Sequence, residues 1–280
     1  ELKPWQVGEP LPRISSAVPV LSLTNLSTKE SRPGRPSRAC GEAVYRYIST
    51  AVKLILHSDA DAMATAPISK KVLQLAGHRY PGHTEMLADM TRTNDFRMML
   101  LGKKLKVVLV TVHLPLAKVS KVITRKNVRV TLELTHKSLR DRFGIPRPRL
   151  AVAGLNPHAG EEGIFGHEER RAIHPAIKDV HRKGIRAYGP FAADSVFYQA
   201  AQGKYDAVIC MYHDQGLGPL KLLHFVDGVN LTLGLPIVRT SADHGTAYDI
   251  AGKNKADGSS MTEAILLASK LARGKKGQKR

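Results

Sequence analysis

The chain has 280 residues, of which 42% are hydrophobic, so it can bury a sizeable core in one large domain or two subdomains. Its formal net charge of +19 would suit a nucleic-acid-binding protein, but the basic residues are spread along the chain and only 5% are aromatic. No apolar run reaches the roughly 18 residues that span a bilayer, and no signal peptide is visible. The two cysteines, Cys40 and Cys210, lie far apart, which favours a reducing cytoplasm without structural disulfides.

In chain order, an irregular segment rich in proline and serine, residues 1–38, is followed by an amphipathic helix predicted over residues 39–58. Short apolar runs and helical patterns then alternate. The strand-like runs are residues 62–66, 98–101, 106–112, 149–155, 206–211 and 228–234, and the helical patterns are residues 116–143, 168–184 and 259–273. This alternation predicts the α/β fold class, with a sheet that contains much parallel pairing and is flanked by helices.

Three of the strand-like runs end in a histidine, namely His113, His158 and His213. Because the carboxyl ends of parallel strands meet at one edge, three imidazoles there could hold a divalent metal and leave positions open for a substrate. A capping or buried hydrogen-bonded histidine is the alternative for each one alone. Asp194 and Asp214 are candidates for catalysis or for orienting a ligand, with helix capping as the alternative for Asp194.

A second set of residues suits an anion. His83 and Thr84 precede a predicted helix, where backbone N–H groups and the helix dipole favour a phosphate or carboxylate. Lys221, Asn230 and Arg239 supply a point charge, an amide and a fork of donors, and Lys221 is also a catalytic candidate. Each residue alone is typical of a surface or a cap. Beside a metal site, the set indicates a small, doubly anionic substrate.

Five long motifs extend this pattern, and they read PGHTEML, VHLPL, GLNPHAGEEGIFG, MYHDQGLGPLK and GVNLTLGLPIVRTSADHGTAYDIAGK. Together they resemble the 4-hydroxythreonine-4-phosphate dehydrogenase (PdxA-type) family of vitamin B6 synthesis, from about residue 36 to residue 272. The resemblance implies the fold of the isocitrate and isopropylmalate dehydrogenases, with two α/β/α subdomains around a central cleft. We expect residues 1–76 with 214–280 in the first subdomain, and residues 77–213 in the second, with the metal ligands and the dimer interface.

The resemblance also assigns roles to residues. It implies a divalent metal shared across a homodimer interface, with zinc expected first and magnesium or cobalt as alternatives, held by His113, His158 and His213. It implies substrate contacts from His83, Thr84, Lys221, Asn230 and Arg239. Residues 244–252 resemble the cofactor loop of the isocitrate and isopropylmalate dehydrogenases, so NAD, or NADP as the alternative, is expected at His244, Thr246 and Asp249. A purely structural turn is the other interpretation of this loop.

The activity implied is the NAD-dependent, metal-assisted oxidation of 4-phosphooxy-L-threonine to 2-amino-3-oxo-4-phosphooxybutanoate, which decarboxylates to 3-amino-2-oxopropyl phosphate during pyridoxal phosphate biosynthesis. The nearest alternative is a 4-phospho-D-threonate or 4-phospho-D-erythronate dehydrogenase of the same family. A metal-dependent hydrolase and a basic nucleic-acid-binding protein are less favoured. Members of the family open with a GDPAGIGPE segment that does not precede Glu1, so we expect an amino-terminal portion to be missing.

Overall fold

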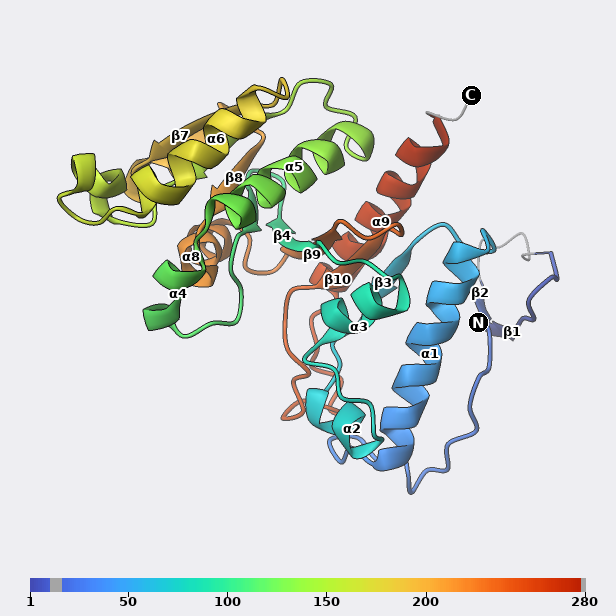
Figure 1. The fold of residues 1–280 in the computed structure, drawn as a ribbon. Helices are drawn as coiled ribbons and strands as arrows, with labels where there is room; N and C mark the ends of the chain where they lie inside the picture. The colour runs from blue at the N-terminus through green and yellow to red at the C-terminus, as the bar shows by residue number, and fades with distance from the viewer. Residues whose placement is uncertain (11–16, 278–280) are drawn as a thin grey trace. The chain divides into compact units, whose positions relative to one another are not determined.

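The computed structural model describes residues 1–10 and 17–277, and its elements are labelled in Figure 1. The described chain divides into two compact units. Residues 1–63, 67–92 and 244–256 form the first, and residues 64–66, 93–243 and 257 onward form the second. These boundaries differ from the expected 1–76 with 214–280 and 77–213. The reason is that residues 83–90 pack against the first long helix, whereas residues 229–242 belong to the sheet of the second unit.

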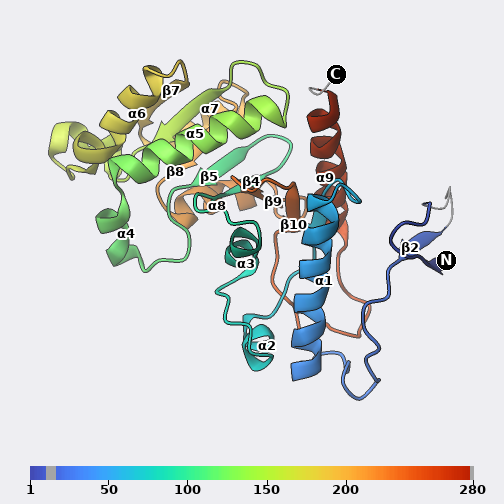
Figure 2. The ribbon, with the colours of Figure 1, turned by 45° about the vertical axis from the view of Figure 1, so that its right-hand side comes forward.

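The first unit contains three helices, α1 (Arg38–Leu56), α2 (Lys70–Leu75) and α3 (His83–Met90). Both α2 and α3 contact α1, as Figure 2 shows, and α1 confirms the helix predicted over residues 39–58. It begins where Ser37 Oγ accepts a hydrogen bond from Cys40 N. Gly41 allows α2 to approach, because a Cβ atom there would lie 2.2 Å from Val72 O. The amino-terminal segment, expected to be irregular, forms two short parallel strands, β1 (Leu2–Pro4) and β2 (Val18–Val20).

An eight-stranded sheet has the order β3-β10-β9-β4-β5-β8-β6-β7. Its strands are β3 (Met63–Thr65), β4 (Arg97–Leu101), β5 (Lys106–Leu109), β6 (Arg149–Ala153), β7 (Arg186–Phe191), β8 (Ala207–Cys210), β9 (Val229–Leu233) and β10 (Arg239–Ala242). All six predicted strands are confirmed, whereas β7 and β10 were not predicted. The strands β5, β8, β6 and β7 pair in parallel, and β5, β4, β9 and β10 pair antiparallel. The mixed α/β class is therefore confirmed.

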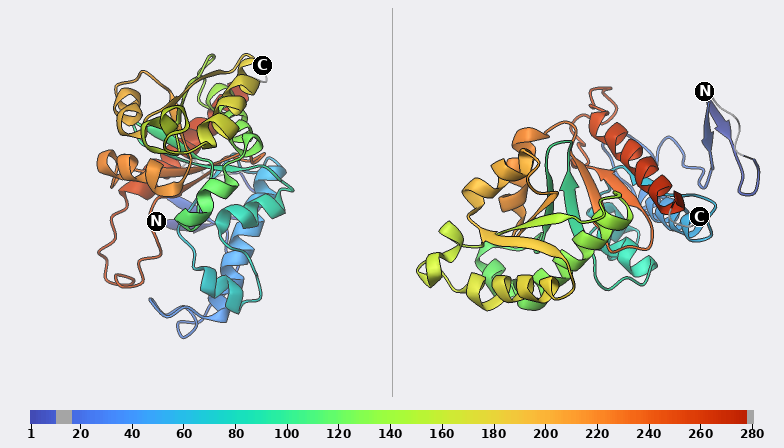
Figure 3. Two further views of the ribbon diagram at one scale, coloured as in Figure 1. Left: turned by 60° about the vertical axis from the view of Figure 1, so that its left-hand side comes forward. Right: turned by 90° about the horizontal axis from the view of Figure 1, so that it is seen from above.

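Helices cover both faces of this sheet. They are α4 (Leu116–Val122), α5 (Arg125–Asp141), α6 (His174–His181), α7 (Ala193–Ala201), α8 (His213–Leu223) and α9 (Ser259–Gly277), with the short helical turns η1 (Pro157–Gly163) and η2 (Glu169–Ile173). Figure 3 shows α5 and α6 on one face and α7 and α8 on the other. The single helix predicted over residues 116–143 is two helices, because Thr124 caps the start of α5. Among the described residues, no helix is both long and apolar enough to cross a membrane.

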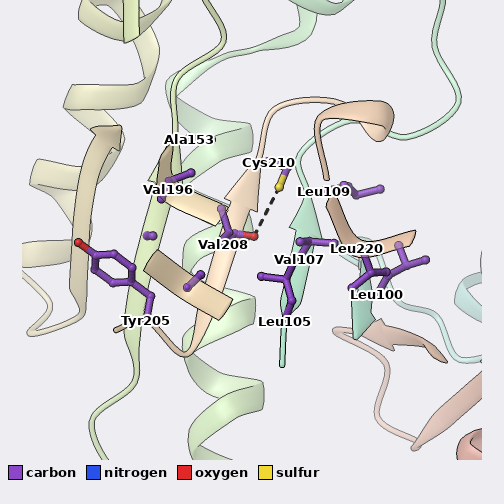
Figure 4. Packing of buried hydrophobic residues seen from close by; sticks show 12 residues of the cluster. Leu100, Leu105, Val107, Leu109, Ala153, Val196, Tyr205, Val208, Cys210 and Leu220 are labelled. Atoms are coloured by element: carbon purple, nitrogen blue, oxygen red, sulfur yellow. Dashed lines mark hydrogen bonds between the residues drawn. The ribbon is translucent and has the colours of Figure 1, made fainter. Parts of the chain in front are cut away.

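The core under α7 and α8 is mainly aliphatic, with side chains from β4, β5, β6 and β8 and from the two helices, together with Tyr205 (Figure 4). Gly216 allows α8 to pack closely on this core, since a Cβ atom there would lie only 3.0 Å from both Cys210 Sγ and Leu109 Cδ2. Both cysteines of the chain are free. Burial raises the pKa of the Cys210 thiol, so this side chain acts as an unreactive core residue.

Removing core volume should destabilise the second unit. Leu109 is 0% exposed, so Leu109→Ala should lower the free energy of unfolding by roughly 2–5 kcal/mol, measured by urea denaturation. The same substitution at Leu266, which is 58% exposed, should change it by no more than about 0.5 kcal/mol. Equal losses in the two variants would contradict this assignment of the core.

Candidate functional site

Three neighbouring parallel strands carry the three histidines of the motifs. The strand β8 lies between β5 and β6 and pairs in parallel with both, so their carboxyl ends share one edge of the sheet, as predicted. His113 follows β5, His213 is the first residue of α8 after β8, and His158 lies in η1 after β6. Open α/β sheets bind their ligands at this edge.

His113 and His213 lie beside each other within one chain. Their ring centroids are 5.9 Å apart, with an interplanar angle of 39°. Two imidazoles bound to one zinc ion have centroids about 5–6 Å apart, given Zn–N distances of about 2.0–2.1 Å. His213 Nδ1 is 2.7 Å from Asp214 Oδ1, so the carboxylate orients the ring and leaves Nε2 for a ligand. The pair fits a shared metal ion in type and spacing.

His158 lies apart from this pair. Its ring is exposed and packs against Phe165, with ring centroids 5.9 Å apart. Over residues 1–10 and 17–277, no three histidine, cysteine, aspartate or glutamate side chains are close enough together to hold a metal ion. Two of the three predicted ligands, His113 and His213, therefore lie side by side in space within one chain. The third, His158, follows the neighbouring strand β6.

Hydrogen bonds fix the three strand ends against one another. Thr111 Oγ1 donates to Met211 O at 2.7 Å, which joins the end of β5 to the end of β8. The buried side chain of Gln215 joins β8 to β6, since its Oε1 accepts from Met211 N and its Nε2 donates to Gly154 O, both at 2.6 Å. The segments with the histidines thus leave the sheet from one hydrogen-bonded frame.

The turn η1 has a left-handed backbone. The φ angle is positive at six consecutive residues, with values of 51° at His158, 53° at Ala159, 83° at Gly160, 38° at Glu161, 57° at Glu162 and 107° at Gly163. Two of the six are glycines, and each of the other four costs of order 1–3 kcal/mol in this conformation. Such a turn persists only where its surroundings hold it.

Two glutamates of the following segment bind this turn. Glu169 is 2% exposed, and its Oε1 accepts hydrogen bonds from Leu155 N at 2.8 Å and Asn156 N at 2.9 Å. Its Oε2 accepts from Asn156 Nδ2 at 2.9 Å. Hydrogen bonds from Ser120 Oγ and then Asn156 Nδ2 hold the pKa of the neighbouring Glu168 below its usual range. Glu169 was not predicted from the sequence, because no local pattern marks a carboxylate that binds a turn earlier in the chain.

The predicted anion-binding residues of the second unit lie on α8, β9 and β10. Lys221 Nζ forms an ion pair with Asp243 Oδ2 at 2.6 Å and donates to Asp243 O at 2.8 Å. The buried guanidinium of Arg239 donates to Thr65 Oγ1 at 2.8 and 3.2 Å. Asn230 Oδ1 is buried and, among the described residues, has no hydrogen-bond partner. A buried polar atom of this kind is a candidate contact for a ligand.

His83 and Thr84 belong to the first unit and are the first two residues of α3, whereas they were predicted to precede this helix. Gly82 at the N-cap provides no side-chain acceptor, so the first N–H groups of α3 form the kind of helix end that binds anions.

The predicted cofactor residues His244, Thr246 and Asp249 lie on an exposed loop of the first unit. Thr246 lines a cavity of about 230 Å³ together with Arg32 and Arg35. Neither arginine was predicted from the sequence, since the segment around them has no regular pattern. Their charges suit the phosphates of a dinucleotide.

The two carboxylates proposed for catalysis lie in the first turns of α7 and α8. Asp194 is exposed and is not the N-cap of α7, which is Ala192. Asp214 is exposed and interacts with His213.

A mixed α/β sheet with imidazoles, carboxylates and cations at its strand ends defines an enzyme-like α/β protein. The family model described as "Pyridoxal phosphate biosynthetic protein PdxA" matches residues 5–268, and the chain belongs to this family. It is 54% identical over 258 residues to the 4-hydroxythreonine-4-phosphate dehydrogenase of Geobacter metallireducens, covering 92% of this chain and 76% of that protein.

Two further similarities concern Salmonella and Klebsiella proteins. The chain is 50% identical over 239 residues to the D-threonate 4-phosphate dehydrogenase of Salmonella typhimurium, covering 85% of this chain and 73% of that protein. The crystal structure of 4-hydroxythreonine-4-phosphate dehydrogenase from Klebsiella pneumoniae has a TM-score of 0.85 and 47% identity, covering 91% of this chain and 77% of that one. These three relatives are named dehydrogenases, and the family that the motifs predicted is confirmed.

Replacing Gln215 should weaken the frame of the site. Gln215→Leu has nearly the same shape but leaves Met211 N and Gly154 O unpaired, so the free energy of unfolding should fall by roughly 2–6 kcal/mol at about 1–3 kcal/mol for each group. Gln202→Leu, the same change at the exposed C-cap of α7, should stay within about 0.5 kcal/mol. Chemical denaturation measures both, and a neutral Gln215→Leu would contradict the role of this amide.

Proposed function

We propose that the protein oxidises the secondary alcohol of 4-phosphooxy-L-threonine, with NAD as hydride acceptor and with a divalent metal bound by His113, His158 and His213. The product, 2-amino-3-oxo-4-phosphooxybutanoate, is a β-keto acid that loses carbon dioxide to give 3-amino-2-oxopropyl phosphate. The observation that carries the proposal is the pair of adjacent imidazoles at the carboxyl edge of the sheet. The 54% identical relative of the same name supports the substrate.

The donor set supports a metal of the zinc type. Imidazole nitrogens suit zinc, and cobalt is the alternative, whereas magnesium prefers oxygen ligands and has less support. When bound, the metal supplies a Lewis acid that lowers the pKa of the substrate hydroxyl. The chain itself orients the ligand His213. Asp214 Oδ1 lies 2.7 Å from His213 Nδ1 and favours the tautomer with the proton on Nδ1, which leaves the Nε2 lone pair to bind a metal. Asp194, Asp214 and Lys221 stay the candidates for proton transfer.

The charged and amide side chains of the second unit support binding of a phosphorylated acid. Lys221 and the buried Arg239 are cations, and Asn230 adds a polar atom without a partner among the described residues. We propose that these residues, with His83 and Thr84 at the start of α3, bind the substrate phosphate and carboxylate.

The cofactor is proposed to bind at the loop of His244, Thr246 and Asp249. Support comes from the cavity of about 230 Å³ that Thr246 lines with Arg32 and Arg35, whose positive charges complement dinucleotide phosphates. NADP is the alternative cofactor, since an arginine can also bind the additional 2′-phosphate of NADP.

A second candidate substrate is 4-phospho-D-threonate, which has a hydroxyl group where phosphothreonine has its amine. The 50% identical D-threonate 4-phosphate dehydrogenase favours it, and 4-phospho-D-erythronate belongs to the same class. The phosphate and carboxylate contacts proposed above would serve all three substrates.

We further propose a cytoplasmic homodimer. The free cysteines support a reducing compartment. Exposed apolar side chains such as Leu222 and Phe225 provide surface that a dimer interface would bury. Because His113 and His213 are adjacent in one chain, a site shared between subunits would take both of them from the same subunit.

Turnover should depend on the metal ligands. With 4-phosphooxy-L-threonine and NAD, the protein should produce reduced nicotinamide, and exhaustive chelation should abolish this absorbance change. His113→Ala and His213→Ala should lose most of the turnover, whereas the exposed His57→Ala should retain it. Full turnover after chelation would contradict the metal, and turnover of 4-phospho-D-threonate alone would select the second candidate.

Loss of a cation should weaken binding of the phosphorylated substrate. Lys221→Ala or Arg239→Ala should raise KM by an amount equivalent to roughly 2–5 kcal/mol, because a substrate charge loses its partner. The exposed Lys204→Ala is the matched control and should leave KM unchanged. Steady-state kinetics with a phosphorylated and an unphosphorylated substrate measure the effect, and an equal loss for both substrates would place the phosphate elsewhere.

A further inference from the structure

The turn with His158 cannot hold its shape through its own backbone preferences. Its six positive φ angles, between 38° and 107°, fall in a region that residues other than glycine rarely adopt. Within the turn, Ala159 N donates to Asn156 O at 3.1 Å and Phe165 N donates to Gly160 O at 3.2 Å. Further contacts from outside the turn are needed to select this conformation.

The carboxylate of Glu169 provides these contacts. It accepts hydrogen bonds from two successive backbone N–H groups, at Leu155 and Asn156, just before the turn. It also fits between two glycines. A Cβ atom at Gly160 would lie 2.7 Å from Glu169 Oε2, and one at Gly154 would lie 3.1 Å from Glu169 Oε1. The glycines therefore make room for a buried carboxylate against the turn.

We propose that Glu169 is a positioning residue, whose carboxylate fixes the left-handed turn and thereby presents His158 at the carboxyl edge of the sheet. This inference rests on the proposed function for the role of His158 as a metal ligand. The effect on the turn itself is a property of the metal-free chain. Partners that orient a metal ligand in this way typically change metal affinity by about 10–100-fold when they are removed.

Graded variants separate this role from a general loss of fold. Glu169→Gln keeps one carbonyl oxygen for the two backbone N–H groups, but its amide would face the donor Asn156 Nδ2. Glu169→Ala loses all three hydrogen bonds. Glu161→Gln is the matched control, because it makes the same change at an exposed carboxylate of the same turn.

The experiment measures hydrogen–deuterium exchange of residues 154–165 in the metal-free protein, and zinc affinity by competition with a chromophoric chelator. Exchange should be faster in Glu169→Gln than in wild type and fastest in Glu169→Ala. Zinc affinity should fall in the same order, by about 10–100-fold for Glu169→Ala. Glu161→Gln should match wild type in both measurements. Circular dichroism reports whether each variant folds, and Glu169→Gln alone carries the test if Glu169→Ala does not fold.

Each outcome decides one part of the proposal. Unchanged exchange in the folded Glu169 variants would overturn the role of Glu169 in the turn. Faster exchange with unchanged zinc affinity would overturn its link to His158. A wild-type protein that binds no zinc would contradict the proposed metal site, and the exchange data would then decide separately whether Glu169 holds the turn.

Discussion

The side-chain amide of Gln215 is the contact on which the candidate site depends. Beyond the last ladder bond of a strand, backbone groups lack strand partners, and this buried amide joins the end of β8 to the end of β6 through one donor and one acceptor. The residues next to Gln215 in sequence also shape this strand end. Asp214 lies beside the imidazole of His213, and Gly216 lets α8 pack directly on the core. Four successive residues thus end a strand, orient an imidazole and begin a helix.

The strands that were predicted are those with continuous apolar runs, because burial on both faces leaves that pattern in the sequence. Two strands were not predicted, because their sequences lack this continuous apolar pattern. The strand β7 is interrupted by Gly189 and Pro190, and β10 is polar. Its buried polar side chains are satisfied by tertiary hydrogen bonds, such as that of Thr240 Oγ1 to Ala264 O at 2.8 Å, which no local pattern encodes. The unit boundaries were missed for the same reason, since they depend on which strands β9 and β10 join.

The candidate site was predictable where a general rule applied. Histidines after parallel strands share an edge by topology alone, which placed His113, His158 and His213 on adjacent strand ends. The left-handed turn of His158 and its contact with Glu169 were not predictable, because they depend on hydrogen bonds across 13 and 14 residues of chain. Sequence therefore indicates which side chains reach the edge, and tertiary contacts decide how they are held.

The central claim is that a divalent metal binds at this edge of the sheet. Anomalous X-ray diffraction from crystals grown with zinc, recorded on both sides of the zinc absorption edge, tests it most directly. The account predicts an anomalous peak within zinc-bonding distance of the imidazoles of His113 and His213, whose ring centroids are 5.9 Å apart. A fully zinc-loaded protein whose anomalous peaks all lie away from these two histidines would contradict it.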